Sequence, residues 1–493
     1  MSRSLVDLRR LLGVVGAFML SVGFSGGVHG AAASPTVSGP VTGGNGRPVL
    51  FAHGAFDLAT VGYTQSEFFV AGTASAYSPT SALTSDGRWT VQLSSQAAYV
   101  TRIVVDRPIH RRKFNGAVLV EWLNVSGGAD ASPAWTFVHD ELIRRGYAYV
   151  AVSAQFVGVN QLKNLGLPAP GDPIRYASLV HPGDSYSYDI FSQAAQAIRD
   201  NAQLVLGGLR PERLIAMGES QSAARLVTYF NAAHPRVTVY DGFLIGSRGA
   251  AGAALSQPPF PSFPAPVPTR IRDDLITPVL VLNSETDTGA LQARQVDSSV
   301  YRLWEVAGSA HFDLYGLFQG ASDTGGRGSV IDWFNSMLNP PLSPTPTSNC
   351  PMPVNTGPRT FVQRAALAHL NRWAADGTPP PMAPRLETIS IVPAQYALDA
   401  NGNVLGGIRT PAVDAPVAKL SGLGQTGVGA QFCFLFGTTA TFTQEQLTAL
   451  YRNHGRFVLA WSRATLDAVR DGFVLPNDGL NILVVGAQSD VLK

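Results

Sequence analysis

The sequence Arg213-Leu214-Ile215-Ala216-Met217-Gly218-Glu219-Ser220-Gln221-Ser222-Ala223 decides how the rest of the chain is interpreted. Its first half is a short apolar run, typical of a strand buried on both faces of a parallel sheet. Its second half is Gly-x-Ser-x-small, followed by apolar residues at helical spacing from Ala223 to Phe230. A strand, a tight turn with a serine at its apex and a helix directly behind predict a nucleophile elbow. Ser220 is therefore the candidate catalytic nucleophile.

The elbow requires small residues two places before and two places after the serine, because the strand and helix backbones nearly touch there. Gly218 meets this requirement, whereas Ser222 stands where glycine is commoner. The competing interpretation is a Gly-Ser turn between an ordinary strand and helix. The strand–turn–helix context favours the elbow.

A catalytic serine needs a base to take its proton, and the base needs an acid that fixes its tautomer. In a doubly wound sheet both follow later strands, the acid first and the histidine last. The buried strand predicted at residues 278–282 leads to Glu285 and Asp287, and the strand predicted at 303–306 leads to His311.

We therefore predict a catalytic triad of Ser220, Asp287 and His311, with Glu285 as the alternative acid. Asp287 is favoured because the loop has cleared the strand at that point. Asp313 is a weaker third candidate, since it follows the histidine.

A tetrahedral intermediate carries negative charge on an oxygen that needs preorganised N–H donors, each worth roughly 3 kcal/mol. One donor is expected from the backbone N–H of Gln221, at the start of the elbow helix. The second is expected from Ser126 and Gly127, in a glycine loop that follows the predicted strand at residues 117–123. An ordinary strand-to-helix turn is the alternative reading of that loop.

Composition and charge exclude several function classes. The chain has 493 residues, 14% of them charged, with a formal net charge of +2. Such a balance argues against nucleic acid or an anionic membrane as a partner, because both require clustered Lys and Arg. The G-x-G-x-x-G match at residues 422–427 lacks the strand and helix of a dinucleotide site, and no zinc motif occurs. We expect no cofactor and no metal.

The first 33 residues have the pattern of a signal peptide: Arg3, Arg9 and Arg10, an apolar run over residues 11–24, and small residues at 31–33. The run is too short to span a bilayer comfortably. Cleavage would leave a secreted or cell-envelope protein without a transmembrane span, and a retained N-terminal anchor is the alternative.

Export bears on the two cysteines, Cys350 and Cys433, because an oxidising compartment allows them to pair. A bond closing a loop of this size stabilises by roughly 4 kcal/mol in the chain-entropy model. We predict a disulfide between them, with two buried free thiols as the alternative.

The order of elements predicts an α/β fold. Strands at residues 68–70, 89–93 and 99–105 suggest an N-terminal β meander. Strand and helix patterns then alternate to about residue 311, which implies βαβ crossovers and a doubly wound, mostly parallel sheet. Residues 34–382 would form this catalytic core with its insertions. Residues 383–493 would form an α+β extension packed on the core, a candidate lid.

The extension carries three local predictions. The pair Asn401-Gly402 suits the type I′ turn of a hairpin. A helix pair is expected to follow it. A C-terminal strand is expected at residues 482–485.

These stretches make the chain resemble the α/β-hydrolase fold superfamily, and within it a group of exported bacterial proteins called alpha/beta hydrolase domain-containing proteins. The resembling segments are residues 121–128, 218–223, 284–287, 304–308 with His311, and 406–411. The resemblance implies a serine hydrolase acting on an ester-like bond, with Ser220, one of the two acids and His311 as the triad.

The leading hypothesis is a secreted serine hydrolase that cleaves a small-molecule or lipid-like carboxylic ester through an acyl-enzyme. One alternative is a peptidase or amidase on the same fold. Another is a non-catalytic binding protein on a hydrolase scaffold.

Overall fold

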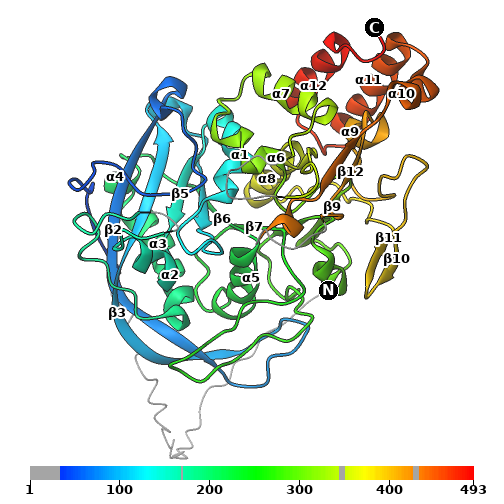
Figure 1. The fold of residues 1–493 in the computed structure, drawn as a ribbon. Helices are drawn as coiled ribbons and strands as arrows, with labels where there is room; N and C mark the ends of the chain where they lie inside the picture. Colours follow the sequence, from blue (N-terminus) through cyan, green and yellow to red (C-terminus); the bar gives the residue numbers. More distant parts are fainter. Residues whose placement is uncertain (1–33, 168–169, 343–349, 426–431) are drawn as a thin grey trace, which may run out of the picture. The chain divides into compact units, whose positions relative to one another are not determined.

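The fold is organised around one large sheet, seen in a computed structural model that describes residues 34–167, 170–342, 350–425 and 432–493. Within these ranges the sheet has nine strands in the order β1-β2-β3-β5-β4-β6-β7-β8-β9 (Figure 1). Strands β5, β4, β6, β7, β8 and β9 are parallel, whereas β1, β2 and β3 pair antiparallel with their neighbours. The predicted signal peptide at residues 1–33 lies outside the described residues.

The strands of the large sheet are β1 (Thr36–Ser38), β2 (Tyr63–Pro79), β3 (Val91–Pro108), β4 (Ala117–Trp122), β5 (Ala148–Val152), β6 (Arg213–Glu219), β7 (Gly242–Gly246), β8 (Val279–Ser284) and β9 (Tyr301–Val306). Two small antiparallel pairs follow: β10 (Thr388–Ile391) with β11 (Ala394–Tyr396), and β12 (Ala418–Ser421) with β13 (Thr438–Thr441).

The helices are α1 (Pro133–Arg145), α2 (Phe156–Gln161), α3 (Ser187–Asp200), α4 (Ala202–Val205), α5 (Gln221–Thr228), α6 (Leu314–Leu317), α7 (Arg327–Leu338), α8 (Arg359–Asp376), α9 (Pro411–Asp414), α10 (Gln444–Tyr451), α11 (His454–Arg470) and α12 (Pro476–Gln488). A π-helical turn, Tyr229–Ala233, continues α5.

Helices cover both faces of the parallel strands, as a doubly wound sheet requires. Successive side chains of a strand point to opposite faces, and in β6 Leu214 and Ala216 enter one buried cluster while Ile215 and Met217 enter another. The first cluster includes residues of α3 and α5, and the second includes residues of α1 and α8. Burial on both faces explains why the central strands are continuous apolar runs. The structure thus confirms the predicted α/β-hydrolase fold class.

The N-terminal strands differ from the prediction. Residues 91–93 and 99–105 of the two expected segments belong to one strand, β3, which pairs with β2 across 16 registered positions with a shift between Ser75 and Tyr77. The stretch 94–98 is polar and small, which resembles a turn in sequence. A two-stranded ribbon tolerates such residues because much of its surface faces water, so the predicted break was wrong.

Two predictions for the extension also need correction. Residues 482–485 lie in α12, not in a strand, because Pro476 begins a helix whose Ile482 and Val485, three apart, are both buried. The chain does turn back at Asn401-Gly402, with Leu398 bridging Val404. Only Gly402 has a positive φ, of 82°, whereas a type I′ turn needs positive φ at both central residues. The expected helix pair is present as α10 and α11.

The proline-rich segment after β7 has no helix or ladder strand between Gly246 and Val279, as its prolines predict. A bilayer-spanning helix is absent from the described ranges, in which no helix reaches the required length with sufficient apolar character.

Candidate active site

Ser220 occupies the turn between β6 and α5 with φ 60° and ψ −117°. This left-handed backbone is costly for a residue with a side chain and is the strained geometry of a nucleophile elbow. The backbone N–H of Ser220 donates to the oxygen of Gly246, in the neighbouring strand, at 2.9 Å. The turn is thereby fixed at the carboxyl edge of the sheet, with Ser220 partly exposed.

The contacts of Gly218 and Ser222 explain why the first is glycine, as expected, and why the second can be serine where glycine is commoner. A Cβ on Gly218 would lie 2.9 Å from the backbone oxygen of Ser222, so a larger residue would collide with the helix. The Ser222 hydroxyl accepts from the N–H of Glu219 and donates to its carbonyl oxygen, both at 2.9 Å. The serine at the commoner glycine position therefore closes the turn with its side chain.

The structure brings His311 and Asp287 together. His311 Nδ1 lies 2.6 Å from Asp287 Oδ1, and the backbone N–H of His311 donates to Thr286 Oγ1 at 3.1 Å. Asp287 Oδ2 accepts from both the N–H and the hydroxyl of Ser284, at 2.7 and 2.9 Å. The imidazole is 12% exposed and the carboxylate 3%, so the pair opens toward solvent on the histidine side.

Burial alone would raise the pKa of Asp287. Its hydrogen bond and charge interaction with His311, together with the nearby Arg359 guanidinium, outweigh burial and lower that pKa below its ordinary value. Asp287 therefore remains a carboxylate at neutral pH, the form that orients an imidazole and stabilises an imidazolium.

The other two candidate acids make different contacts. Glu285 Oε1 accepts from the N–H of Gly308 at 2.6 Å and Oε2 from the N–H of Gly422 at 2.7 Å, and burial raises the pKa of Glu285 to about 7. Asp313 caps α6 by accepting from the N–H of Gly316 at 3.0 Å, and burial raises its pKa to about 7 as well. Neither carboxylate pairs with His311.

The glycine loop after β4 lies against the elbow, because Asn124 Nδ2 donates to the backbone oxygen of Glu219 at 2.9 Å. Asn124 Oδ1 accepts from the N–H of Ser126 at 2.8 Å. The N–H groups of Val125 and Gly127 make no hydrogen bond to any described residue. Of the two residues predicted here, Ser126 therefore has its amide occupied and Gly127 does not.

Gln221, the predicted first amide donor, begins α5 directly after Ser220. Its side chain exchanges hydrogen bonds with Gln155, at 2.6 and 3.1 Å. Gln155 Oε1 also accepts from Arg225 Nε, one turn further along α5. These contacts hold the start of the helix.

A buried arginine joins the elbow to the histidine, a contact that was not predicted from the sequence. Glu219 Oε2 accepts from Arg359 Nη2 at 2.5 Å, and the second amino group of Arg359 donates to the backbone oxygen of His311. Gln363, one turn along α8, donates to Glu219 Oε1. Glu219 lies within the elbow motif, but its partners are 140 and 144 residues away, and no local pattern identifies them.

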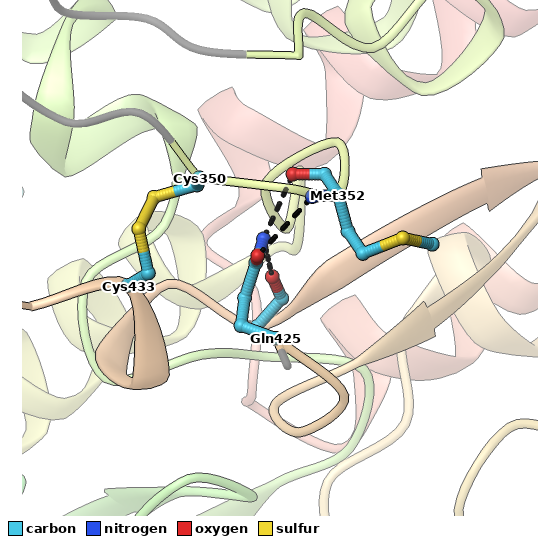
Figure 2. Close-up of a disulfide and its surroundings, with 5 residues drawn as sticks. Cys350, Met352, Gln425 and Cys433 are labelled. Carbon is cyan, nitrogen blue, oxygen red and sulfur yellow. Dashed lines mark hydrogen bonds between the residues drawn. A yellow bond between two sulfur atoms is a disulfide. The ribbon is translucent and has the colours of Figure 1, made fainter. Parts of the chain in front are cut away.

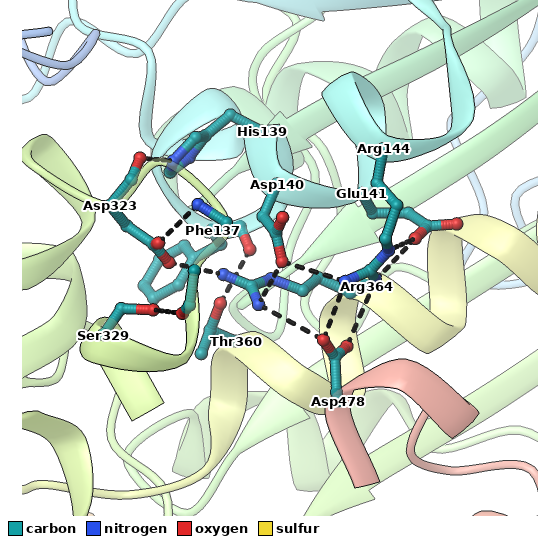
Figure 3. Close-up of polar contacts among 12 residues, drawn as sticks. Phe137, His139, Asp140, Glu141, Arg144, Asp323, Ser329, Thr360, Arg364 and Asp478 are labelled. Carbon is teal, nitrogen blue, oxygen red and sulfur yellow. Dashed lines mark hydrogen bonds and ion pairs between the residues drawn. The ribbon is translucent and has the colours of Figure 1, made fainter. Parts of the chain in front are cut away.

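Helix α8, which carries Arg359, is anchored by a network of charged side chains (Figure 3). Arg364 lies 2.8 Å from Asp140 of α1 and 3.0 Å from Asp323. Asp478 of α12 lies 2.9 Å from Arg144, which also pairs with Asp140. The network joins helices α1, α8 and α12.

The disulfide predicted between Cys350 and Cys433 is present (Figure 2). It belongs to a small buried cluster with Val354, Phe436 and Leu314, the first residue of α6. The cluster lies directly behind the histidine loop.

Backbone hydrogen bonds extend from the disulfide to that loop. The N–H of Phe312 donates to the oxygen of Leu435 at 3.1 Å, and the N–H of Leu314 donates to the oxygen of Asn355 at 2.8 Å. Both segments adjoining the disulfide therefore support the residues that follow His311.

The described residues contain no group of three or more His, Cys, Asp or Glu side chains arranged to hold a metal ion.

The sheet order, the strained serine and the His–Asp pair define the class of protein as an α/β hydrolase. A family model described as "Alpha/beta hydrolase domain" matches residues 37–484, and the chain belongs to this family. No curated protein resembles it in sequence at a significant level.

Three solved structures illustrate the likeness. An esterase from Rhizomucor miehei is 15% identical, covering 62% of this chain and 84% of that one, with a TM-score of 0.30. A putative dienelactone hydrolase from Klebsiella pneumoniae is 17% identical, covering 55% and 97%, with a TM-score of 0.26. A thermostable esterase from Pseudomonas putida is 14% identical, covering 48% and 67%, with a TM-score of 0.25.

Proposed function

We propose that the protein is an exported serine hydrolase that cleaves a carboxylic ester through an acyl-enzyme, with Ser220, His311 and Asp287 as its triad. The observation that carries the proposal is the 2.6 Å contact between His311 Nδ1 and Asp287 Oδ1. Both residues lie on loops that follow parallel strands of the large sheet, at the same edge of the sheet as the strained Ser220. This contact fixes the tautomer in which Nε2 is free to accept a proton.

In the first half of the reaction, Ser220 Oγ attacks the ester carbonyl carbon while His311 Nε2 takes the hydroxyl proton. The tetrahedral intermediate collapses, the alcohol leaves with that proton, and the acyl group remains on Ser220. Water then attacks the acyl-enzyme, giving its proton to His311, and the carboxylic acid departs as Ser220 recovers its hydrogen. Asp287 stabilises the imidazolium that forms in each half.

The oxyanion of each tetrahedral intermediate needs N–H donors. We assign the first to the backbone of Gln221, at the N-terminus of α5, where the helix dipole adds favourable potential. The second belongs to the loop after β4, which Asn124 holds against the elbow. Since the Ser126 amide donates to Asn124, the amide of Gly127 or that of Val125, on either side of Ser126, would supply this donor.

Export of the protein is part of the proposal. The Cys350–Cys433 disulfide suits an oxidising compartment, and the N-terminal sequence has the pattern of a signal peptide. Mass spectrometry of the protein from the culture medium and the cell envelope tests this, with an N-terminus near residue 33 expected.

The catalytic proposal is tested with Ser220→Ala. A fluorophosphonate probe should label the wild type and not the variant, and hydrolysis of p-nitrophenyl acyl esters should fall by at least about 10³-fold while the melting temperature stays within about 2 °C. Peptide anilides assayed in parallel distinguish an esterase from an amidase. Labelling of the variant at the wild-type rate would refute Ser220 as the nucleophile.

A further inference from the structure

Arg359, the first residue of α8, lies between the nucleophile elbow and the histidine loop. Its Nη2 donates to Glu219 Oε2 at 2.5 Å, its Nη1 donates to the backbone oxygen of His311, and its Nε donates to Gln363 Oε1 at 3.1 Å. The guanidinium carbon lies 4.3 Å from the centre of the Phe137 ring. The arginine is 0% exposed, and the carboxylate of Glu219 is its ion-pair partner.

The acidic partner of Arg359, Glu219, is part of the nucleophile elbow. Glu219 directly precedes Ser220 and is 2% exposed. Its second oxygen accepts from Gln363, so both carboxylate oxygens are satisfied from α8. Gly246 leaves the space for this side chain, since a Cβ there would lie 2.1 Å from Glu219 Oε1. A residue larger than glycine at position 246 would therefore displace Glu219 from its ion pair with Arg359.

The other hydrogen bonds that His311 itself makes to described residues go to the acid loop. Asp287 binds its ring, and Thr286 binds its backbone N–H. These contacts fix the histidine relative to the acid and leave its distance from the serine undefined. Among the hydrogen bonds of the described residues, the one from Arg359 links His311 to the elbow.

We propose that Arg359 is a positioning residue, which bridges Glu219 and the backbone of His311 and so sets the distance between the general base and the nucleophile. The inference rests on the proposed function. Proton transfer needs the base within about 2.6–3.2 Å of the hydroxyl oxygen, and a displacement of about 1 Å can cost about 100-fold in rate.

Arginine suits this role better than lysine. Its planar fork donates to two acceptors in a fixed geometry, whereas a lysine ammonium is a point charge on a flexible stem. Its helix is also immobilised. Thr360 Oγ1, on the next residue of the helix, donates to the backbone oxygen of Phe137 in α1 at 2.8 Å (Figure 3).

The test compares Arg359→Lys, Arg359→Met and Glu219→Gln with Arg364→Met as the matched control. Arg364 lies on the same helix and is also buried, at 2% exposed, but it pairs with Asp140 and Asp323 instead of Glu219. Each variant is assayed with a p-nitrophenyl ester for kcat and KM well below its melting temperature. Hydrogen exchange of the peptide spanning residues 307–318 is measured alongside.

Arg359→Met should lower kcat at least about 30-fold with KM changed less than about threefold, and should speed exchange in the histidine loop. Arg359→Lys should recover part of this loss, because it keeps the charge and loses the bidentate bridge. Glu219→Gln should lower kcat in the same direction. Arg364→Met should lower the melting temperature yet keep kcat within about threefold.

A wild-type kcat in Arg359→Met or in both Arg359→Lys and Glu219→Gln overturns the proposal. So does an equal kcat loss in Arg364→Met, which would make the effect one of general destabilisation. The exchange measurement separates this inference from the function. A further outcome is a wild type that hydrolyses no ester while hydrogen exchange in the histidine loop still rises in Arg359→Met and not in Arg364→Met. That result would support the Arg359 bridge and refute the proposed activity.

Discussion

The carboxylate of Glu285 accepts a hydrogen bond from the backbone N–H of Gly422, at 2.7 Å, across 137 residues of sequence. Its other oxygen accepts from the N–H of Gly308, two residues after β9 ends. The next residue, Thr286, donates to the backbone oxygen of Gly422 at 2.6 Å. The C-terminal extension therefore supports the loops that carry Asp287 and His311, and its role as a lid stays a prediction.

The two acids of this loop should respond differently to loss of charge. Asp287→Asn should lower kcat about 10⁴-fold with little change in melting temperature, because the amide no longer holds the imidazole in the productive tautomer. Glu285→Gln should lower stability by about 1–3 kcal/mol and keep most of kcat, because an amide NH₂ group would face a backbone N–H. Ester kinetics and calorimetry measure both. If Glu285→Gln lost as much kcat as Asp287→Asn, the assignment of Asp287 as the catalytic acid in preference to Glu285 would be contradicted.

Removing the disulfide should destabilise the protein by about 4 kcal/mol, since the bond closes a loop between residues 83 apart. The double variant Cys350→Ser/Cys433→Ser is compared with the wild type by denaturant unfolding, with and without reductant. Reductant should destabilise the wild type and leave the variant unchanged. A wild type whose unfolding is insensitive to full reduction would contradict the prediction.

The buried charged network around Arg364 should stabilise the fold more at neutral pH than at acid pH. Burial alone would raise the pKa of Asp323, but Arg364 and His139 outweigh it and lower that pKa below 3.8. A carboxylate with a lowered pKa stabilises the fold above its unfolded pKa, and this contribution is lost as the pH falls through the folded value. Asp323→Asn should therefore be less stable than the wild type by about 3–5 kcal/mol at pH 7.

The difference between Asp323→Asn and the wild type should begin to shrink near pH 4, where this carboxyl is protonated in the unfolded chain, and should be lost once the pH falls through the lower pKa of the folded state. Denaturant unfolding at several pH values checks this. A difference that stays constant from pH 7 to pH 3 would show that the charge of Asp323 does not contribute.

The elbow should not tolerate a side chain at Gly218. In Gly218→Ala the new Cβ would meet the backbone oxygen of Ser222 at 2.9 Å, so strand and helix must separate. Fluorophosphonate labelling should slow and the melting temperature should fall. Gly328→Ala, in α7, is the control, because nothing lies within 4 Å of its Cβ position. Wild-type labelling of Gly218→Ala would argue against the tight turn.

Local sequence patterns predicted much of the fold. The elbow strand was expected over residues 214–217 and runs Arg213–Glu219, and the strands expected at residues 278–282 and 303–306 are Val279–Ser284 and Tyr301–Val306. Such elements follow from apolar periodicity and turn residues, which act over a few positions. Strands were expected in the β2–β3 ribbon, but their full length was not, because part of the surface of the ribbon faces solvent and its apolar pattern is weak.

The sequence by itself determined the fold class, the serine elbow, and the order of an acid and then a histidine after later strands, because each follows from local strand, turn and helix patterns and from their order along the chain. Only the tertiary structure decided which acid meets His311. Glu285 and Asp287 share one loop, and distant backbone groups at Gly308 and Gly422 bind the first and leave the second to the imidazole. Partner choice between segments far apart in the chain is set by packing, which no local pattern encodes.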